Sequence, residues 1–168
     1  MNPEEIKSLQ APLKELYKTE PSKAFITLKS SGTLGEGITC NVQTGKALVE
    51  AGLHPATGGM NVNACSGDML LESLCACAGV TMNAVAVSIG VNIRSGKVFA
   101  EGDLDFRGTL AVSKEVPVGF QNIRLRFELD TDADNETLSN LLRLTERYCV
   151  VFQTLKRPPL FDVSVIRM

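Results

Sequence analysis

The longest hydrophobic segment of the chain runs from Ser66 to Ile89 (SGDMLLESLCACAGVTMNAVAVSI). Its length and its small and aliphatic residues predict a single helix of roughly 35 Å. Only Asp68, Glu72 and Asn83 in this segment carry a charge or an amide, so most faces of the helix must be buried. Asp68 falls in the first turn, where a carboxylate stabilises the positive end of the helix dipole. Gly90 predicts the end of the helix.

Apolar residues three and four positions apart predict two further helices. The first is an amphipathic helix over Pro3–Tyr17, which makes residues 1–20 an N-terminal helical extension. The second covers Glu136–Tyr148 and is expected to break at Cys149 and continue as a short helix to Leu155. The two prolines at positions 158 and 159 end this segment.

Alternating or continuous apolar stretches predict strands in the remaining segments. They are Ala24–Lys29, Ile38–Gln43, Lys46–Glu50, Val91–Phe106 with a break at 94–96, Leu110–Val112, Phe120–Leu129 and Leu160–Ile166. The strands come in runs and do not alternate with helices. This order predicts an α+β fold with antiparallel meanders, and it argues against a doubly wound parallel sheet.

Composition and charge favour one soluble domain over residues 1–168. Apolar residues make up 44% of the chain, charged residues 21%, and the net charge is −2 with both signs mixed. This pattern gives no basic face for nucleic acid. The charged start of the chain lacks the apolar region of a signal peptide. The polar side chains and alanines of Ser66–Ile89 make it a poor membrane span, so we expect a cytoplasmic protein without a membrane partner.

The chain has five cysteines, at positions 40, 65, 75, 77 and 149. An odd number without a secretion signal indicates reduced thiols in the cytosol. Cys75 and Cys77 lie about 200° apart around a helix, so they face opposite ways and do not ligate one metal ion together. His54 is the only histidine. We therefore predict neither a metal site nor a cofactor.

A buried cysteine is most often a small hydrophobic residue, and we interpret Cys40, Cys65 and Cys75 in this way. Cys149 differs because it falls where the third helix breaks, among charged residues that include Arg147 and Lys156. Nearby cations lower the pKa of a thiol. A helix thiol such as Cys77 and a second thiol near a helix end are the minimum for dithiol redox chemistry. Spacing alone leaves open that both thiols only pack.

Four segments, in order, resemble the OsmC/Ohr family of osmotically induced and organic hydroperoxide resistance proteins. Residues 42–45 (VQTG) resemble a strand and turn of the family's meander, and residues 58 and 59 resemble its glycine pair. Asp68–Cys77 (DMLLESLCAC) is similar to the family segment ELLLAALGSC, which aligns Cys77 with the helix thiol. Arg147–Leu155 (RYCVVFQTL) is similar to KYCPVSNTL, which aligns Cys149 with the second thiol.

The resemblance implies an OsmC-like fold in which antiparallel sheets wrap long central helices in an intertwined homodimer. It also implies a thiol-dependent peroxidase without a cofactor. In such an enzyme Cys77 would attack an organic or hydrogen peroxide, Cys149 would resolve the product as a disulfide, and a dithiol reductant would restore the pair. Asp68 is the candidate for a group that polarises the site.

The chain also departs from the peroxidases of this family. They use an arginine from an early loop and a glutamate before the central helix, but the first arginine here is Arg94, and Gly67 takes the glutamate position. Val150 replaces the proline that commonly follows the second cysteine. These departures support the alternative hypothesis of a non-catalytic small-molecule-binding or stress-associated protein on the same scaffold.

Overall fold

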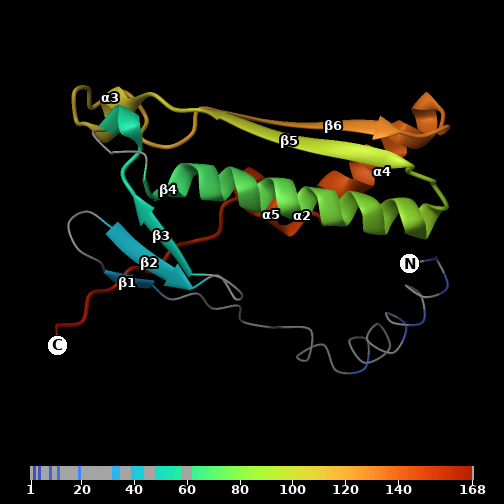
Figure 1. Cartoon of the computed structure of the whole chain (residues 1–168), viewed down its shortest axis with the longest axis horizontal. Helices are drawn as coiled ribbons and strands as arrows, with labels where there is room; N and C mark the ends of the chain where they lie inside the picture. Colours follow the sequence, from blue (N-terminus) through green and yellow to red (C-terminus); the bar gives the residue numbers. More distant parts are fainter. Residues whose placement is uncertain are drawn as a thin grey trace. The chain divides into compact units, whose positions relative to one another are not determined.

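The computed structural model (Figure 1) describes residues 2, 4, 8, 11, 19, 32–34, 39–43, 48–57 and 62–167. The predicted helix Pro3–Tyr17, which defines the extension over residues 1–20, lies outside the described residues apart from the isolated positions just given. The predicted strand Ala24–Lys29 also lies outside them.

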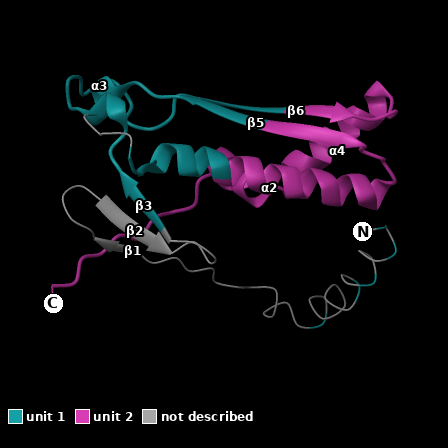
Figure 2. Ribbon diagram, viewed as in Figure 1, with its two compact units in different colours: residues 1–72, 99–126 teal, residues 73–98, 127–168 magenta. Residues whose placement is uncertain are grey.

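The chain forms two compact units, residues 1–72 with 99–126 and residues 73–98 with 127–168 (Figure 2). Helix α2 (Ser66–Ile89) and strands β5 (Ser95–Asp103) and β6 (Asn122–Asp130) contribute residues to both units. The prediction of a single domain over residues 1–168 is not tested by this division and stays a prediction.

The first unit contains a small sheet with the strand order β1-β2-β3-β4. Its strands are β1 (Gly32–Leu34), β2 (Thr39–Gln43), β3 (Leu48–Gly52) and β4 (Ala64–Cys65). The β1–β2 and β2–β3 pairs are antiparallel, whereas β3 and β4 pair in parallel. The β2–β3 pair confirms the antiparallel pairing of the predicted strands Ile38–Gln43 and Lys46–Glu50, and β1 lies in a segment where no strand was predicted. A 3₁₀ turn, η2 (Pro55–Thr57), lies between β3 and β4. The two residues of β4 are too few to show a strand periodicity, so this strand was not predicted.

Helix α2 begins and ends at the predicted residues, Ser66 and Ile89. Gly90 ends it with φ of 75°, a left-handed conformation that glycine adopts without strain. The N–H groups of Gly90 and Val91 donate to the carbonyl oxygens of Val87 and Ala86, the two bonds of a Schellman motif. By length and composition α2 would pass as a membrane-spanning helix, a test that buried core helices of soluble proteins pass as well.

Strands β5 and β6 form a second, two-stranded sheet. Backbone bonds from Arg94 to Asp130 and from Gln121 to Asp103 lie near its two ends, so the strands run antiparallel. Between them the predicted strand Leu110–Val112 is wrong. The chain there forms a turn after the short helix α3 (Phe106–Thr109), which Asp105 caps by accepting a bond from the N–H of Arg107.

Two consecutive helices follow β6, as predicted. Helix α4 (Asn135–Tyr148) is capped by Asp134, whose side chain accepts a bond of 2.8 Å from the N–H of Thr137. Helix α5 (Val150–Lys156) begins one residue after α4 ends. The predicted strand Leu160–Ile166 is wrong, because this segment pairs with no strand among the described residues. Alternating apolar and polar residues do not form a strand unless a neighbouring strand supplies hydrogen-bond partners for the backbone.

Candidate active site

The packed faces of α2 and α4 bring the two candidate cysteines together within the second unit. Leu141 of α4 packs in a core cluster with Met82, Val85 and Ala86 of α2. One turn later on α4, the Thr145 hydroxyl lies 3.5 Å from the Met82 sulfur. One further turn along α4, Cys149 reaches Cys77 on the preceding part of α2. The two helices therefore run antiparallel, and the thiol pair continues their core contact.

Cys149 belongs to the ends of both α4 and α5. Its N–H donates to the carbonyl oxygen of Thr145, and its own carbonyl oxygen accepts from the N–H of Gln153, both at 2.9 Å. Its extended backbone, with ψ of 109°, changes the direction of the chain between the helices. The Gln153 side chain donates to the carbonyl oxygen of Glu146 at 2.6 Å and thereby braces the break. The first N–H groups of α5 have no helical acceptors and are available to a thiolate.

Cys77 is half-buried, and four donors surround its sulfur. Burial by itself raises the pKa of this thiol. The backbone N–H of Val151, the Cys149 thiol, the N–H of Val150 and the Thr81 hydroxyl act in the opposite direction. The donors prevail, so the pKa of Cys77 lies below the ordinary value for a thiol. The Thr81 hydroxyl also donates to the Cys77 carbonyl oxygen at 2.8 Å, and its single proton serves one acceptor at a time.

The pKa of Cys149 is shifted in the opposite direction and lies above the ordinary value for a thiol. Burial raises the pKa of its thiol most, and the hydrogen bond and charge of Cys77 raise it further, against the N–H groups of Phe152 and Val151. Only 1% of Cys149 is exposed. The two sulfurs titrate as a coupled pair, and the favoured singly ionised form has a thiolate on Cys77 and a thiol on Cys149. This is the division that a nucleophile and a resolving thiol require.

The other cysteines lie elsewhere. Cys75 donates its thiol proton to the carbonyl oxygen of Val98 in β5 at 3.1 Å, so it faces away from Cys77 as the helix spacing predicts. Cys65 is half-buried in β4, and Cys40 belongs to β2, where side chains are not described. All four cysteines with described side chains are free thiols.

Asp68, the third predicted site residue, is exposed in the first turn of α2. It precedes Cys77 by nine residues, which corresponds to a rise of about 13 Å along a helix. Its role as a polarising group stays a prediction. Within the described part of the chain, no three His, Cys, Asp or Glu residues gather in a way that could hold a metal ion.

Sequence reasoning missed the donors around the Cys77 sulfur. Thr81 follows Cys77 by four residues, so helix periodicity could have pointed to it. The N–H groups of Val150 and Val151 are backbone atoms, and only the break at Cys149 aims them at the sulfur. These neutral donors, and not an arginine, lower the pKa of Cys77.

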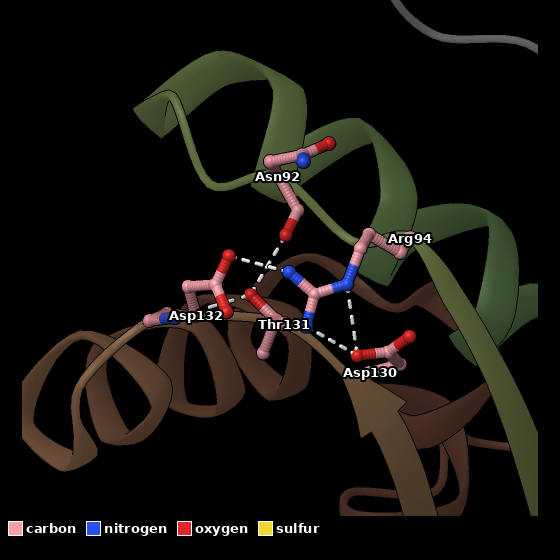
Figure 3. Close-up of polar contacts among 6 residues, drawn as sticks. Asn92, Arg94, Asp130, Thr131 and Asp132 are labelled. Carbon is pink, nitrogen blue, oxygen red and sulfur yellow. Dashed lines mark hydrogen bonds and ion pairs between the residues drawn. The ribbon is translucent and has the colours of Figure 1, made fainter.

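Arg94 makes an ion-pair cluster at the other end of the α2–α4 contact (Figure 3). Its guanidinium binds Asp130, with a bond of 2.9 Å from Nε, and also Asp132. Beside it the Thr131 hydroxyl donates to the carbonyl oxygen of Asn92 at 2.7 Å. The cluster joins the loop after α2 to the end of β6 and to the loop before α4. Arg94 is therefore engaged in holding these loops.

A family model described as OsmC-like protein matches residues 59–164. No curated protein matches the sequence. Among solved structures, an OsmC-like protein from Mycoplasma pneumoniae is 15% identical, with a TM-score of 0.66 over 79% of this chain and 89% of that one.

Two solved structures named as organic hydroperoxide resistance proteins are also similar. The protein from Elizabethkingia anophelis is 16% identical, with a TM-score of 0.64 over 80% of this chain and 91% of that one. The protein from Legionella pneumophila is 13% identical, with a TM-score of 0.62 over 79% and 91%. At these identities the structures show the fold, and they confirm the predicted α+β, OsmC-like architecture.

Proposed function

Because the chain belongs to the OsmC-like protein family, we propose that it is a cysteine-based, thiol-dependent peroxidase. Family membership and the neighbours named for organic hydroperoxide resistance support a peroxide-related role. The observation that carries the mechanism is the contact of Cys77 with Cys149, in which hydrogen-bond donors favour the thiolate on Cys77. The substrate is an organic or hydrogen peroxide.

In the first step the Cys77 thiolate attacks one oxygen of the peroxide. The O–O bond breaks, the sulfur becomes a sulfenic acid, and the other oxygen leaves as an alkoxide that takes a proton to give an alcohol, or water from hydrogen peroxide. The N–H groups of Val150 and Val151 hold the thiolate for this attack. A neutral thiol would be a far weaker nucleophile.

In the second step Cys149 attacks the sulfenic sulfur of Cys77. A disulfide forms and one water leaves. The two thiols are near enough for each to shift the pKa of the other, which places Cys149 as the resolving thiol for this step. A dithiol reductant then restores the pair, and the need for such a reductant favours the cytoplasm as the compartment.

We also propose that the protein acts as a homodimer. Exposed residues of α2 follow a helical stripe, namely Ser73, Ala76, Val80 and Asn83, and 71% of Val80 is exposed. The C-terminal segment 160–166 carries five apolar residues that are each at least 83% exposed. A second copy would cover surfaces that are costly to leave in water. Sedimentation should give about twice the chain mass of 18.1 kDa, and Val80→Glu should shift it toward the monomer.

The alternative hypothesis is a small-molecule-binding protein whose thiols only pack. One observation favours it: the groups that lower the pKa of Cys77 are all neutral. The peroxidases of the family use a charged arginine at this point. Neutral hydrogen-bond donors lower the pKa of a thiol, but they offer no planar guanidinium to orient a peroxide. The two hypotheses therefore differ in whether peroxide is consumed.

Steady-state consumption of cumene hydroperoxide with dithiothreitol tests the proposal. Wild-type protein should turn over, Cys77→Ser should lose all activity above the uncatalysed rate, and Cys149→Ser should lose most of it. Cys75→Ser is the matched control, because its thiol lies on the same helix but bonds to Val98. Equal rates in wild type and Cys77→Ser would reject the peroxidase in favour of the alternative.

A further inference from the structure

We propose that Gln153 is a positioning residue of the reaction. Its side chain binds the carbonyl oxygen of Glu146, and this bond frees the N–H of Val150 to bind the Cys77 sulfur. Because this role concerns the same thiol pair, it deepens the proposed peroxidase function and rests on it. All of the residues involved belong to α2, α4 and α5 within the second unit.

The carbonyl oxygens at the end of α4 need hydrogen-bond donors. In an α-helix each N–H donates to the carbonyl oxygen four residues earlier. The N–H of Cys149 still follows this rule, because it donates to the carbonyl oxygen of Thr145 at 2.9 Å. The next bond of the series would run from Val150 to Glu146. An uninterrupted helix would therefore use the Val150 N–H within the helix, and that N–H would not reach the Cys77 sulfur.

Gln153 supplies the donor for Glu146 from the first turn of α5. Its side-chain Nε2 donates to the Glu146 carbonyl oxygen at 2.6 Å in a partly buried position. The backbone of Gln153 is also held at both of its polar groups. Its N–H donates to the carbonyl oxygen of Cys149, and its own carbonyl oxygen accepts from the N–H of Arg157, both at 2.9 Å. The Glu146 carbonyl oxygen is thus satisfied without the Val150 N–H.

The N–H groups that follow the break bind sulfur. With ψ of 109°, Cys149 lies outside the helical range and turns the next peptide groups away from the axis of α4. The N–H groups of Val150 and Val151 then bind the Cys77 sulfur. The break that ends α4 therefore provides two backbone donors for the thiolate that attacks the peroxide.

Two acceptors compete for the Val150 N–H, namely the Glu146 carbonyl oxygen and the Cys77 sulfur. A partly buried carbonyl oxygen without a donor costs free energy. If the Gln153 amide is removed, the chain recovers this free energy by extending α4 through Val150. Cys77 then loses a donor that stabilises its thiolate, and the thiol holds its proton more tightly.

Val150→Pro isolates the N–H for which the two acceptors compete. Proline has no N–H, and it is favoured at the first position of a helix, which Val150 occupies in α5. The extended ψ of Cys149 suits a residue that precedes proline. Proline also prevents α4 from continuing. The substitution therefore removes one donor from Cys77 and keeps the break in place, with or without the Gln153 amide.

A double-mutant cycle of wild type, Gln153→Met, Val150→Pro and the double variant tests the proposal. Methionine keeps the length of the glutamine side chain and lacks its amide. The ultraviolet absorbance of the Cys77 thiolate is followed as pH rises, as the difference between each protein and the same protein with Cys77→Ser. Ser139→Ala is the matched control, because its hydroxyl donates to an α4 carbonyl oxygen, that of Asn135, at 2.8 Å. The titration uses no peroxide, so it fails separately from the proposed function.

We expect each single substitution of the cycle to move the midpoint of the titration to higher pH. Below the midpoint the thiolate fraction should fall about fivefold, the effect of one lost neutral hydrogen bond. In the Val150→Pro protein, Gln153→Met should add no further shift, and Ser139→Ala should leave the midpoint of the wild type unchanged. The proposal is overturned by an unchanged midpoint in Gln153→Met, by an equal shift in Ser139→Ala, or by equal effects of Gln153→Met with and without Val150→Pro.

A measurement on the wild-type protein keeps the proposal testable if a variant fails to fold. In nuclear magnetic resonance spectra, the amide proton of Val150 should follow the ionisation of Cys77 as pH rises. The side-chain amide of Gln153 should exchange with water more slowly than a free side chain does. A Val150 resonance that does not respond to this ionisation, or a Gln153 amide that exchanges like a free side chain, would overturn the proposal.

Discussion

Leu141→Ala should destabilise the protein strongly, because Leu141 anchors the α2–α4 contact that aligns the two thiols. Leu141 is 0% exposed and packs against Met82, Val85 and Ala86. Truncation of a fully buried leucine loses its transfer free energy and leaves a cavity, at a total cost of about 3 kcal/mol. With a urea dependence of about 2 kcal/mol per molar, the unfolding midpoint should fall by about 1.5 M.

Leu142→Ala is the matched control for this measurement. It is the same substitution at the next residue of α4, where 42% of the leucine is exposed. The smaller area removed from water predicts a loss of about 1 kcal/mol or less. Urea unfolding followed by circular dichroism gives both values. Equal losses from Leu141→Ala and Leu142→Ala would refute the assignment of the helix contact as the core that positions the thiols.

Three further predictions concern a helix end, a thiol and an ion pair. Gly90→Ala should cost about 1 kcal/mol in urea unfolding, because Gly90 has φ of 75° while an added Cβ would meet nothing within 4 Å, so the cost is backbone strain alone. The rate of Cys77 alkylation by iodoacetamide should rise with pH to a midpoint that lies below the ordinary pKa of a thiol. Cys149→Ala removes one of the hydrogen-bond donors to Cys77 and should move this midpoint to higher pH. A midpoint that does not move would contradict the prediction. The hydrogen bond from Arg94 lowers the pKa of Asp130, so its stabilisation is complete above about pH 4 and is lost as pH falls through the lowered pKa. Arg94→Gln should therefore destabilise the protein at pH 7, and pH-dependent urea unfolding should show the difference from wild type shrinking as pH falls below about 4.

The sequence predicts the helices of the second unit well because their signals are local. The bounds of α2 are those of one apolar segment between Ser66 and Gly90, and α4 follows the leucine periodicity. The strand predictions fail where strand formation depends on a second strand that supplies hydrogen bonds. Leu160–Ile166 alternates like a strand yet pairs with no described strand, and Leu110–Val112 is a turn because Asp105 caps α3 just before it.

The candidate site is predictable only in part. The family resemblance aligns Cys77 and Cys149 with a thiol pair, and the helix spacing separates Cys75 from them. The set of donors that favours the Cys77 thiolate depends on tertiary structure, because the N–H groups of Val150 and Val151 must point toward α2. No periodicity in the sequence reports the direction of a backbone N–H.

The most direct test of the account is a count of free thiols after a single turnover. The fully reduced protein has five cysteines, and one equivalent of cumene hydroperoxide should lower the thiol count per chain from five to three. The two lost thiols should be recovered as a Cys77–Cys149 disulfide, and Cys77→Ser should keep all of its thiols. Equal and slow thiol loss in wild type and Cys77→Ser would contradict the account.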